Sequence, residues 1–353
     1  GVQGSGGARD LDAGQVLLAM AETAECRGAI VQQGGFRALL ALVGAATSAE
    51  TAEVAAWALA KVGISINPAL YPRRIKSAGP EAMVKPRLGL VSEATNELKV
   101  FEACMALCNL ATEPALQDRI LKCGGWRTLQ LTLASDNPLV QRAALEAMSN
   151  MVAHDTVVER LARDESVDLK IFVGFCAAED DATQVAATGA VATLSADVEL
   201  AKKLLEARAL EPLVDAALMT EEPMVMHRVA VALERLVEAD AGAIARADQG
   251  ENAVGALVWL ESCRMCEPAA RAATRALERL RREGVAVPPA EAVKQVVEKI
   301  RREREDKERV EEAEEAEPDE PGAADERCER FETLERSERS VEELAEELDG
   351  TEV

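Results

Sequence analysis

The residues that most often carry out catalysis or bind metals are sparse in this sequence. It contains two histidines, His154 and His227, which lie far apart, and one Cys-x-x-Cys pair, Cys263 and Cys266, on a predicted helix without a second pair or a histidine beside it. A structural zinc site needs four such ligands. His154 follows a helical segment and is interpreted as a C-terminal helix cap. Since the sequence also lacks a phosphate-binding glycine loop and a nucleophile elbow, we expect no enzyme, no metal and no cofactor.

The composition favours an all-α protein with an acidic end. The chain has 353 residues, more than one compact core usually spans, and aromatic residues make up only 3% of it. Of the net charge of −23, residues 311–353 contribute −15, with 19 acidic and 4 basic side chains. Nucleic acid is therefore not an expected partner. With no signal peptide and no apolar run long enough to cross a bilayer, we expect a cytoplasmic protein without membrane contact.

A repeat organises most of the chain. The segment VQQGGFRALLALV recurs as ILKCGGWRTLQLTL and more loosely as LLEARALEPLVDAAL, each time followed by a longer Ala-rich segment. A short helix, a Gly turn and two longer helices at this period are typical of armadillo units, with HEAT repeats as the close alternative. We expect an all-α, right-handed superhelical array of about seven armadillo-type units. Equivalent anchors recur at steps of 42, 48, 41, 43, 42 and 44 residues: Ala19, Lys61, Asn109, Asn150, Thr193, Arg235 and Arg279.

The third helix of each unit is expected to line a concave groove, with residues at i, i+4 and i+8 on one side of it. Aromatic and Met side chains often anchor interfaces, and Asn amides can donate and accept hydrogen bonds to a client backbone. An aromatic here can instead be buried between units, which we leave open for Trp57. The basic stripe at the far end (Arg235, Arg271, Arg275, Arg279) is interpreted as a solvated end cap. The predicted client-binding groove consists of Trp57, Lys61, Phe101, Met105, Asn109, Arg142, Glu146 and Asn150.

The one long step contains an irregular element, KVGISINPALYPRRIKSAGP, from Lys61 to Pro80. Its three prolines prevent a regular helix through it. Loops carry function more often than the elements they join, and this one is basic and aromatic. We expect a loop that faces the client through Asn67, Tyr71, Arg73 and Arg74.

Four segments of the chain resemble the UCS-domain myosin chaperones. They are ALAKVGISINPALYP (58–72), FEACMALCNLAT (101–112), AALEAMSNMV (143–152) and AAEDDATQVAATGAVATL (177–194), and the resemblance runs from about Val31 to Arg282. It implies a protein that folds and protects the motor domain of myosin heavy chain in its concave groove. It also places a groove aromatic at Phe101, eight residues before the anchor Asn.

Larger members of that family carry an N-terminal tetratricopeptide domain that recruits Hsp90. No tetratricopeptide pattern is visible in this chain, which begins with Gly1 in a Gly-rich leader as a fragment would. Hsp90 is therefore expected as a partner only if such a domain precedes this sequence.

Two other functions compete with a myosin chaperone. An importin-like adaptor would pair its groove with a regular Trp and Asn ladder, but here Trp occupies one groove position and Asn two anchors. An enzyme-regulatory scaffold is the second alternative. The expected domains are a flexible Gly-rich leader (1–10), the armadillo array (11–286), a charged exposed helix (287–310) and a largely disordered acidic tail (311–353).

Overall fold

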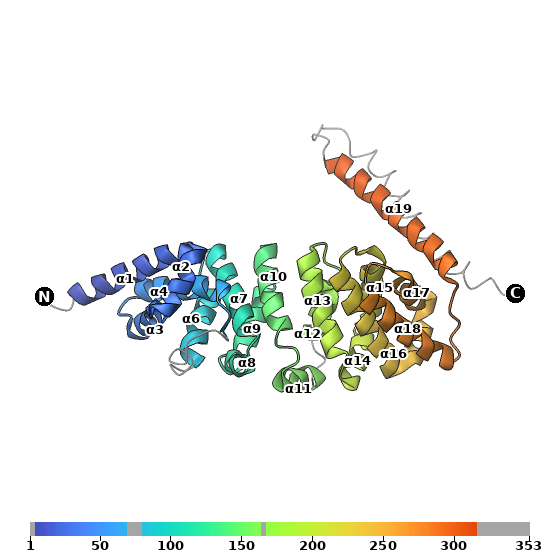
Figure 1. Cartoon of the computed structure of the whole chain (residues 1–353), viewed down its shortest axis with the longest axis horizontal. Coiled ribbons are helices and arrows are strands. Elements are labelled where there is room, and N and C mark those ends of the chain that lie inside the picture. Colours follow the sequence, from blue (N-terminus) through green and yellow to red (C-terminus); the bar gives the residue numbers. More distant parts are fainter. Residues whose placement is uncertain (1–3, 69–79, 164–166, 316–353) are drawn as a thin grey trace. The chain divides into compact units, whose positions relative to one another are not determined.

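The chain folds into α-helices packed in repeated groups (Figure 1). The computed structural model describes residues 4–68, 80–163 and 167–315, and no β-strand occurs within these ranges. The described residues divide into two compact units, the N-terminal unit (Gly1–Asp168) and the C-terminal unit (Leu169–Val353). The prediction of an all-α, armadillo-type array is confirmed.

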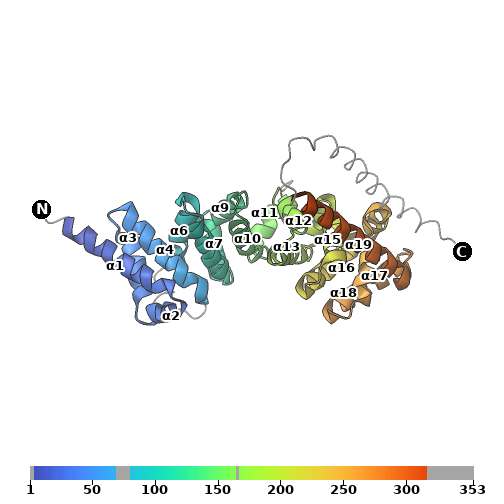
Figure 2. The same cartoon turned by 90° about the horizontal axis from the view of Figure 1, so that it is seen from above.

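Four long helices stand side by side in the N-terminal unit, each packed against the next (Figures 1 and 2). They are the third helices of successive repeats: α1 (Gly4–Glu22), α4 (Ala49–Ser65), α7 (Glu97–Leu110) and α10 (Pro138–Ser149). The other helices of this unit are α2 (Ala24–Gln32), α3 (Gly35–Ala45), α6 (Pro80–Glu93), α8 (Pro114–Lys122), α9 (Gly125–Thr132) and α11 (Asp155–Arg163).

The C-terminal unit repeats this pattern with three third helices: α13 (Asp181–Leu194), the first part of α16 (Pro223–Glu251) and α18 (Glu267–Arg282). The backbone leaves the helical region at Asp240, whose carboxylate accepts the N–H of Ala243, so a second helix begins there and starts the next repeat. Each of the seven predicted anchors therefore lies on, or directly after, a described third helix. The other helices are α12 (Val167–Phe175), α14 (Val198–Glu206), α15 (Leu210–Met219), α17 (Ala253–Ser262) and α19 (Ala290–Glu315).

Small residues and side-chain caps explain why the third helices form and pack closely. Their buried faces are rich in alanine, as at Ala103 and Ala106 of α7, which lets neighbouring backbones approach. Five of them begin with a side chain that accepts a backbone N–H of the first turn, which satisfies a donor that has no partner inside the helix. These caps are Ser48, Asn96, Asn137, Asp180 and Glu222.

A left-handed residue precedes the second helix in four repeats. In two of them it is the glycine that the sequence predicts, Gly34 (φ +88°) and Gly124 (φ +79°). In the other two it is Arg208 (φ +61°) and Asn252 (φ +46°). A side chain with a Cβ is strained in this region, so the turn is a requirement of the fold rather than of one residue type.

We expect Gly124→Ala to destabilise the N-terminal unit by about 1 kcal/mol. A Cβ at this position would meet no neighbouring atom, so the cost comes from the left-handed backbone, which an alanine adopts only with strain. Gly89, inside α6, has equally open surroundings and an ordinary φ, so Gly89→Ala should stabilise by about 0.5–1 kcal/mol. Urea unfolding of both variants checks the pair. Equal effects of the same sign would show that the left-handed turn is not what the glycine supplies.

Each end of the chain contains a described helix. Helix α1 already begins at Gly4, inside the segment expected to be a flexible leader. The charged helix is α19, and most of its described side chains are exposed, although Val293 and Val297 are buried and the helix packs on α17. Residues 316–353 of the acidic tail lie outside the described residues. None of the described helices is both long and apolar enough to cross a membrane.

Candidate functional site

Seven of the eight predicted groove residues lie on the accessible side of three neighbouring third helices, called here the α4–α7–α10 face. Phe101 and Met105 of α7 are half-buried, while Glu102, Cys104 and Ala106 beside them are buried. The half-buried or exposed residues predicted for this face are Trp57, Phe101, Met105, Asn109, Arg142, Glu146 and Asn150. Counting by helical turns therefore selects accessible residues on α7 and α10, but on α4 it also selects Lys61, which is buried.

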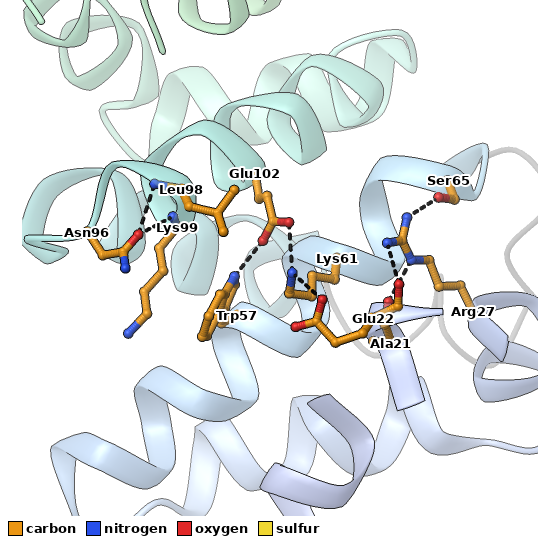
Figure 3. Close-up of polar contacts among 10 residues, drawn as sticks. All are labelled: Ala21, Glu22, Arg27, Trp57, Lys61, Ser65, Asn96, Leu98, Lys99 and Glu102. Carbon is orange, nitrogen blue, oxygen red and sulfur yellow. Dashed lines mark hydrogen bonds and ion pairs between the residues drawn. The ribbon is translucent and has the colours of Figure 1, made fainter. Parts of the chain in front are cut away.

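A polar network joins α1, α4 and α7 at one end of this face (Figure 3). The carboxylate of Glu102 accepts a hydrogen bond from Trp57 Nε1 at 2.5 Å. It also forms an ion pair with Lys61 Nζ at 2.8 Å. Lys61 also pairs with Glu22 at 3.0 Å. Because the lysine is only 3% exposed, its charge depends on these two carboxylates.

The Trp57 ring lies between two ammonium groups. Lys61 Nζ is 4.9 Å and Lys99 Nζ 4.8 Å from its centroid, both within the range of a cation–π contact. Lys99 also pairs with Glu53 at 2.5 Å. These contacts fix the orientation of the indole, so Trp57 offers only part of its surface to a partner.

The inclusion of Lys61 in the client-binding groove is wrong. Its side chain is buried and satisfied by Glu22 and Glu102, so it is not available to a client. The anchor position of this repeat points toward α1 and α7, because two carboxylates there offset the cost of burying an ammonium group.

The two anchor asparagines use their amide nitrogens inside the protein. Asn109 Nδ2 donates to the carbonyls of Gly63 (2.9 Å) and Ile64 (2.6 Å), and Asn150 Nδ2 donates to that of Cys108 (3.1 Å). These carbonyls lie at the C-terminal end of the preceding third helix, where no intrahelical donor is available. The expectation that both amides donate to a client is therefore wrong, and their oxygens alone remain to accept a client N–H.

The anchor position has the same role in one repeat of the C-terminal unit, although the residue differs. Arg235 Nη1 donates to the carbonyl of Ala192, near the end of α13, at 2.6 Å. Arg235 thus ties α16 to α13, as Asn109 ties α7 to α4 and Asn150 ties α10 to α7, whereas Thr193 donates to Gly189 on its own helix.

Of the other predicted arginines, Arg271 and Arg279 are exposed and pair with Glu267 at the start of α18 and Glu283 directly after its end, as a solvated face would. Arg275 is also exposed, but it pairs with Glu234 on the neighbouring third helix α16. The interpretation as a solvated end cap does not hold for Arg235, which is half-buried.

Between α7 and α10, the α4–α7–α10 face contains an ion pair beside a thiol. Arg142 and Glu146 of α10 form an ion pair at 3.8 Å, and Glu146 lies 4.0 Å from Cys108 Sγ on α7. Burial first, and then Glu146, raises the pKa of Cys108 to about 12, although a hydrogen bond from Asn150 lowers it. Burial likewise raises the pKa of Cys104 to about 12.

We expect Cys104 and Cys108 to resist alkylation in the folded chain. A pKa of about 12 instead of 9.0 reduces the thiolate fraction at pH 8 by about a thousandfold, and the thiolate is the reactive form. Mass spectrometry after iodoacetamide treatment, with and without urea, measures this. Labelling of Cys108 at the same rate in both conditions would show that its surroundings do not suppress the thiolate.

The predicted loop is only partly described. Asn67 is exposed just beyond the end of α4, whereas Tyr71, Arg73 and Arg74 lie outside the described residues. The contribution of this loop to client binding stays a prediction.

The histidine and the cysteine pair considered for catalysis or metal binding make contacts within the fold. His154 is not a C-terminal cap: it lies at the start of α11, where Nδ1 accepts the N–H of Thr156 and Nε2 lies 3.3 Å from Asp118. Cys263 and Cys266 are not on a helix but between α17 and α18, and their thiols contact the start of α16. Within the described residues, no three His, Cys, Asp or Glu side chains gather as metal ligands would.

Sequence reasoning missed two buried carboxylates that organise the N-terminal unit. One is Glu102, and the other is Asp168, which accepts hydrogen bonds from Trp126 (3.0 Å) and Gln130 and pairs with Arg160 (3.6 Å). Both are acidic residues within apolar segments. That placement is a usable signal, since such a residue is rarely buried without a partner.

Comparisons with known proteins agree with this architecture. Residues 23–61 match the family described as Armadillo/beta-catenin-like repeat. The human protein unc-45 homolog B is 34% identical over 185 residues, which is 52% of this chain and 19% of that protein. Its zebrafish (Danio rerio) counterpart is 31% identical over 232 residues, 64% of this chain and 24% of that protein. The chain is homologous to the UNC-45 proteins.

A solved structure supports the same homology. UNC-45 from Drosophila melanogaster superposes with a TM-score of 0.68 at 27% identity, covering 77% of this chain and 34% of that one. The chain thus spans about a quarter or less of the two curated UNC-45 relatives, so their whole-protein activities do not transfer directly.

Proposed function

We propose that this chain is a non-enzymatic chaperone that binds the motor domain of myosin heavy chain and assists its folding and stability. The homology to UNC-45 carries the proposal. One UNC-45 chaperone of solved structure binds and folds muscle myosin, and this chain shares its fold (TM-score 0.66, 22% identity). An Hsp90 partnership stays a prediction.

The α4–α7–α10 face is the proposed client-binding surface. It presents half-buried Phe101 and Met105 next to the amide oxygens of Asn109 and Asn150, which no described residue engages. An apolar centre bordered by hydrogen-bond acceptors suits a partly folded client segment. The centre can bury the apolar side chains of the segment, while the amide oxygens accept hydrogen bonds from its backbone N–H groups. Such recognition does not depend on one client sequence.

The test is thermal aggregation of an isolated myosin motor domain, followed by light scattering with increasing amounts of the full chain. We expect suppression near equimolar ratio for the motor and little effect on an unrelated aggregating enzyme. Equal protection of both would indicate a general holdase. Protection of neither, together with binding to an unstructured basic peptide, would favour the alternative of an armadillo adaptor for linear segments.

A further inference from the structure

Helix α19 packs on the second helix α17 of the C-terminal unit and forms a hydrogen bond to the second helix α15. Val293 and Val297, one turn apart, are buried there, at 5% and 0% exposure. Val296 and Ile300 flank them and are half-buried. These apolar residues follow helical spacing, so one side of α19 packs against the rest of the C-terminal unit.

Two arginines complete the contact beyond the valines. Arg301 Nε donates to the carbonyl of Leu218 at 2.7 Å, and its guanidinium lies 5.1 Å from the centroid of the Trp259 ring. Leu218 is in the last turn of α15, where carbonyls lack intrahelical donors and a cation is favoured. Arg304 pairs with Asp215 at 3.0 Å. The α15–α17 face therefore recognises two apolar side chains followed by two arginines.

The attachment of α19 is shallow. After Ile300, the described side chains of this helix are exposed, apart from Arg301, which is half-buried. The connection from α18 runs through Gly284, at φ +82°, and then through a non-helical stretch that ends in Pro288 and Pro289. Such a connection lets α19 leave as one body without disturbing α18, because the prolines already interrupt the helix.

We propose that the α15–α17 face is a helix-binding site, which α19 fills reversibly in cis. Its ligand is an amphipathic helix with the pattern V-x3-V-x3-R-x2-R, and a second helix of that pattern enters when α19 leaves. The tether gives α19 a high effective concentration, so an outside helix competes poorly until the cis contact is weakened. The proposal does not depend on the identity of the client.

The test uses the full chain and a fluorescent peptide of residues 288–306, with binding followed by anisotropy. Val297→Asp places a charge in the buried contact and releases the cis helix. The peptide should then bind at least about tenfold more tightly than to the unaltered chain. Val310→Asp is the matched control, because Val310 lies on the same helix at 40% exposure and should leave binding unchanged.

Arg301→Ala gives the same test without a buried charge, so it applies even if Val297→Asp disturbs the C-terminal unit. It should also increase peptide binding by the chain, whereas the peptide that itself carries Arg301→Ala should bind more weakly. Circular dichroism confirms that each chain is folded. If neither chain variant binds the peptide more tightly than the Val310→Asp chain, the α15–α17 face is not a helix-binding site.

Discussion

Replacing Glu102 with alanine should destabilise the N-terminal unit by about 3 kcal/mol, among the largest effects expected of a single substitution in this chain. The change leaves the buried ammonium of Lys61 with only Glu22, whose side chain is 56% exposed, and removes the acceptor of Trp57 Nε1. The loss arises because an uncompensated buried charge costs more than the intact pair contributes. Urea unfolding, with hydrogen exchange followed in α4 and α7, measures it.

Two variants isolate the cause of that loss. Lys61→Met with Glu102→Leu removes both charges and should recover most of the stability, since a buried pair replaced by apolar groups is often neutral. Glu53→Ala breaks the more exposed pair with Lys99 and should change stability by less than about 1 kcal/mol. A double variant as unstable as Glu102→Ala alone would mean that packing, not charge, is what Glu102 supplies.

The second large effect is expected in binding. Phe101→Ala should weaken affinity for the myosin motor domain by about 2 kcal/mol, roughly thirtyfold, because it removes the apolar centre of the α4–α7–α10 face. The side chain is half-buried, so the fold should lose well under the 3–5 kcal/mol of a fully buried phenylalanine. Titration calorimetry and thermal melting of the same samples separate the two effects.

Leu131→Ala is the matched control for this binding experiment. Leu131 is an apolar residue on the second helix α9, outside the α4–α7–α10 face, and is 62% exposed. Its replacement should change neither affinity nor melting. A Phe101 variant that melts early but still binds the motor like the unaltered chain would remove Phe101 from the proposed site.

The repeat could be predicted because local signals agree at every level. Gly34 and Gly124 mark the left-handed turns, and the 3.6-residue period separates the accessible side of α7 from its buried side. Arg208 shows the limit of such signals, because it adopts the same left-handed conformation although it is not a glycine. The backbone geometry recurs more faithfully than the sequence does.

The errors in the site share one physical origin, the demands of neighbouring helices. Lys61 is among the residues predicted to line the groove, but its side chain is buried because it pairs with Glu22 of α1 and Glu102 of α7. Asn109 is half-buried as expected, yet its amide turns to helix-end carbonyls that would otherwise lack donors. Neither partner set can be read from one helix alone. The docking of α19 was missed for a related reason, since two valines among many charges give a weak apolar signal.

Site-specific photo-crosslinking tests the central claim most directly, because it reports contact at one residue. Benzoylphenylalanine would replace Phe101 in one sample of the 353-residue chain and Leu131 in another, and each would be irradiated with the myosin motor domain. The proposed site requires a crosslink to the motor from position 101 and none from position 131. Crosslinking from position 131 alone, or from neither position while the motor is still protected from aggregation, would contradict a client-binding α4–α7–α10 face.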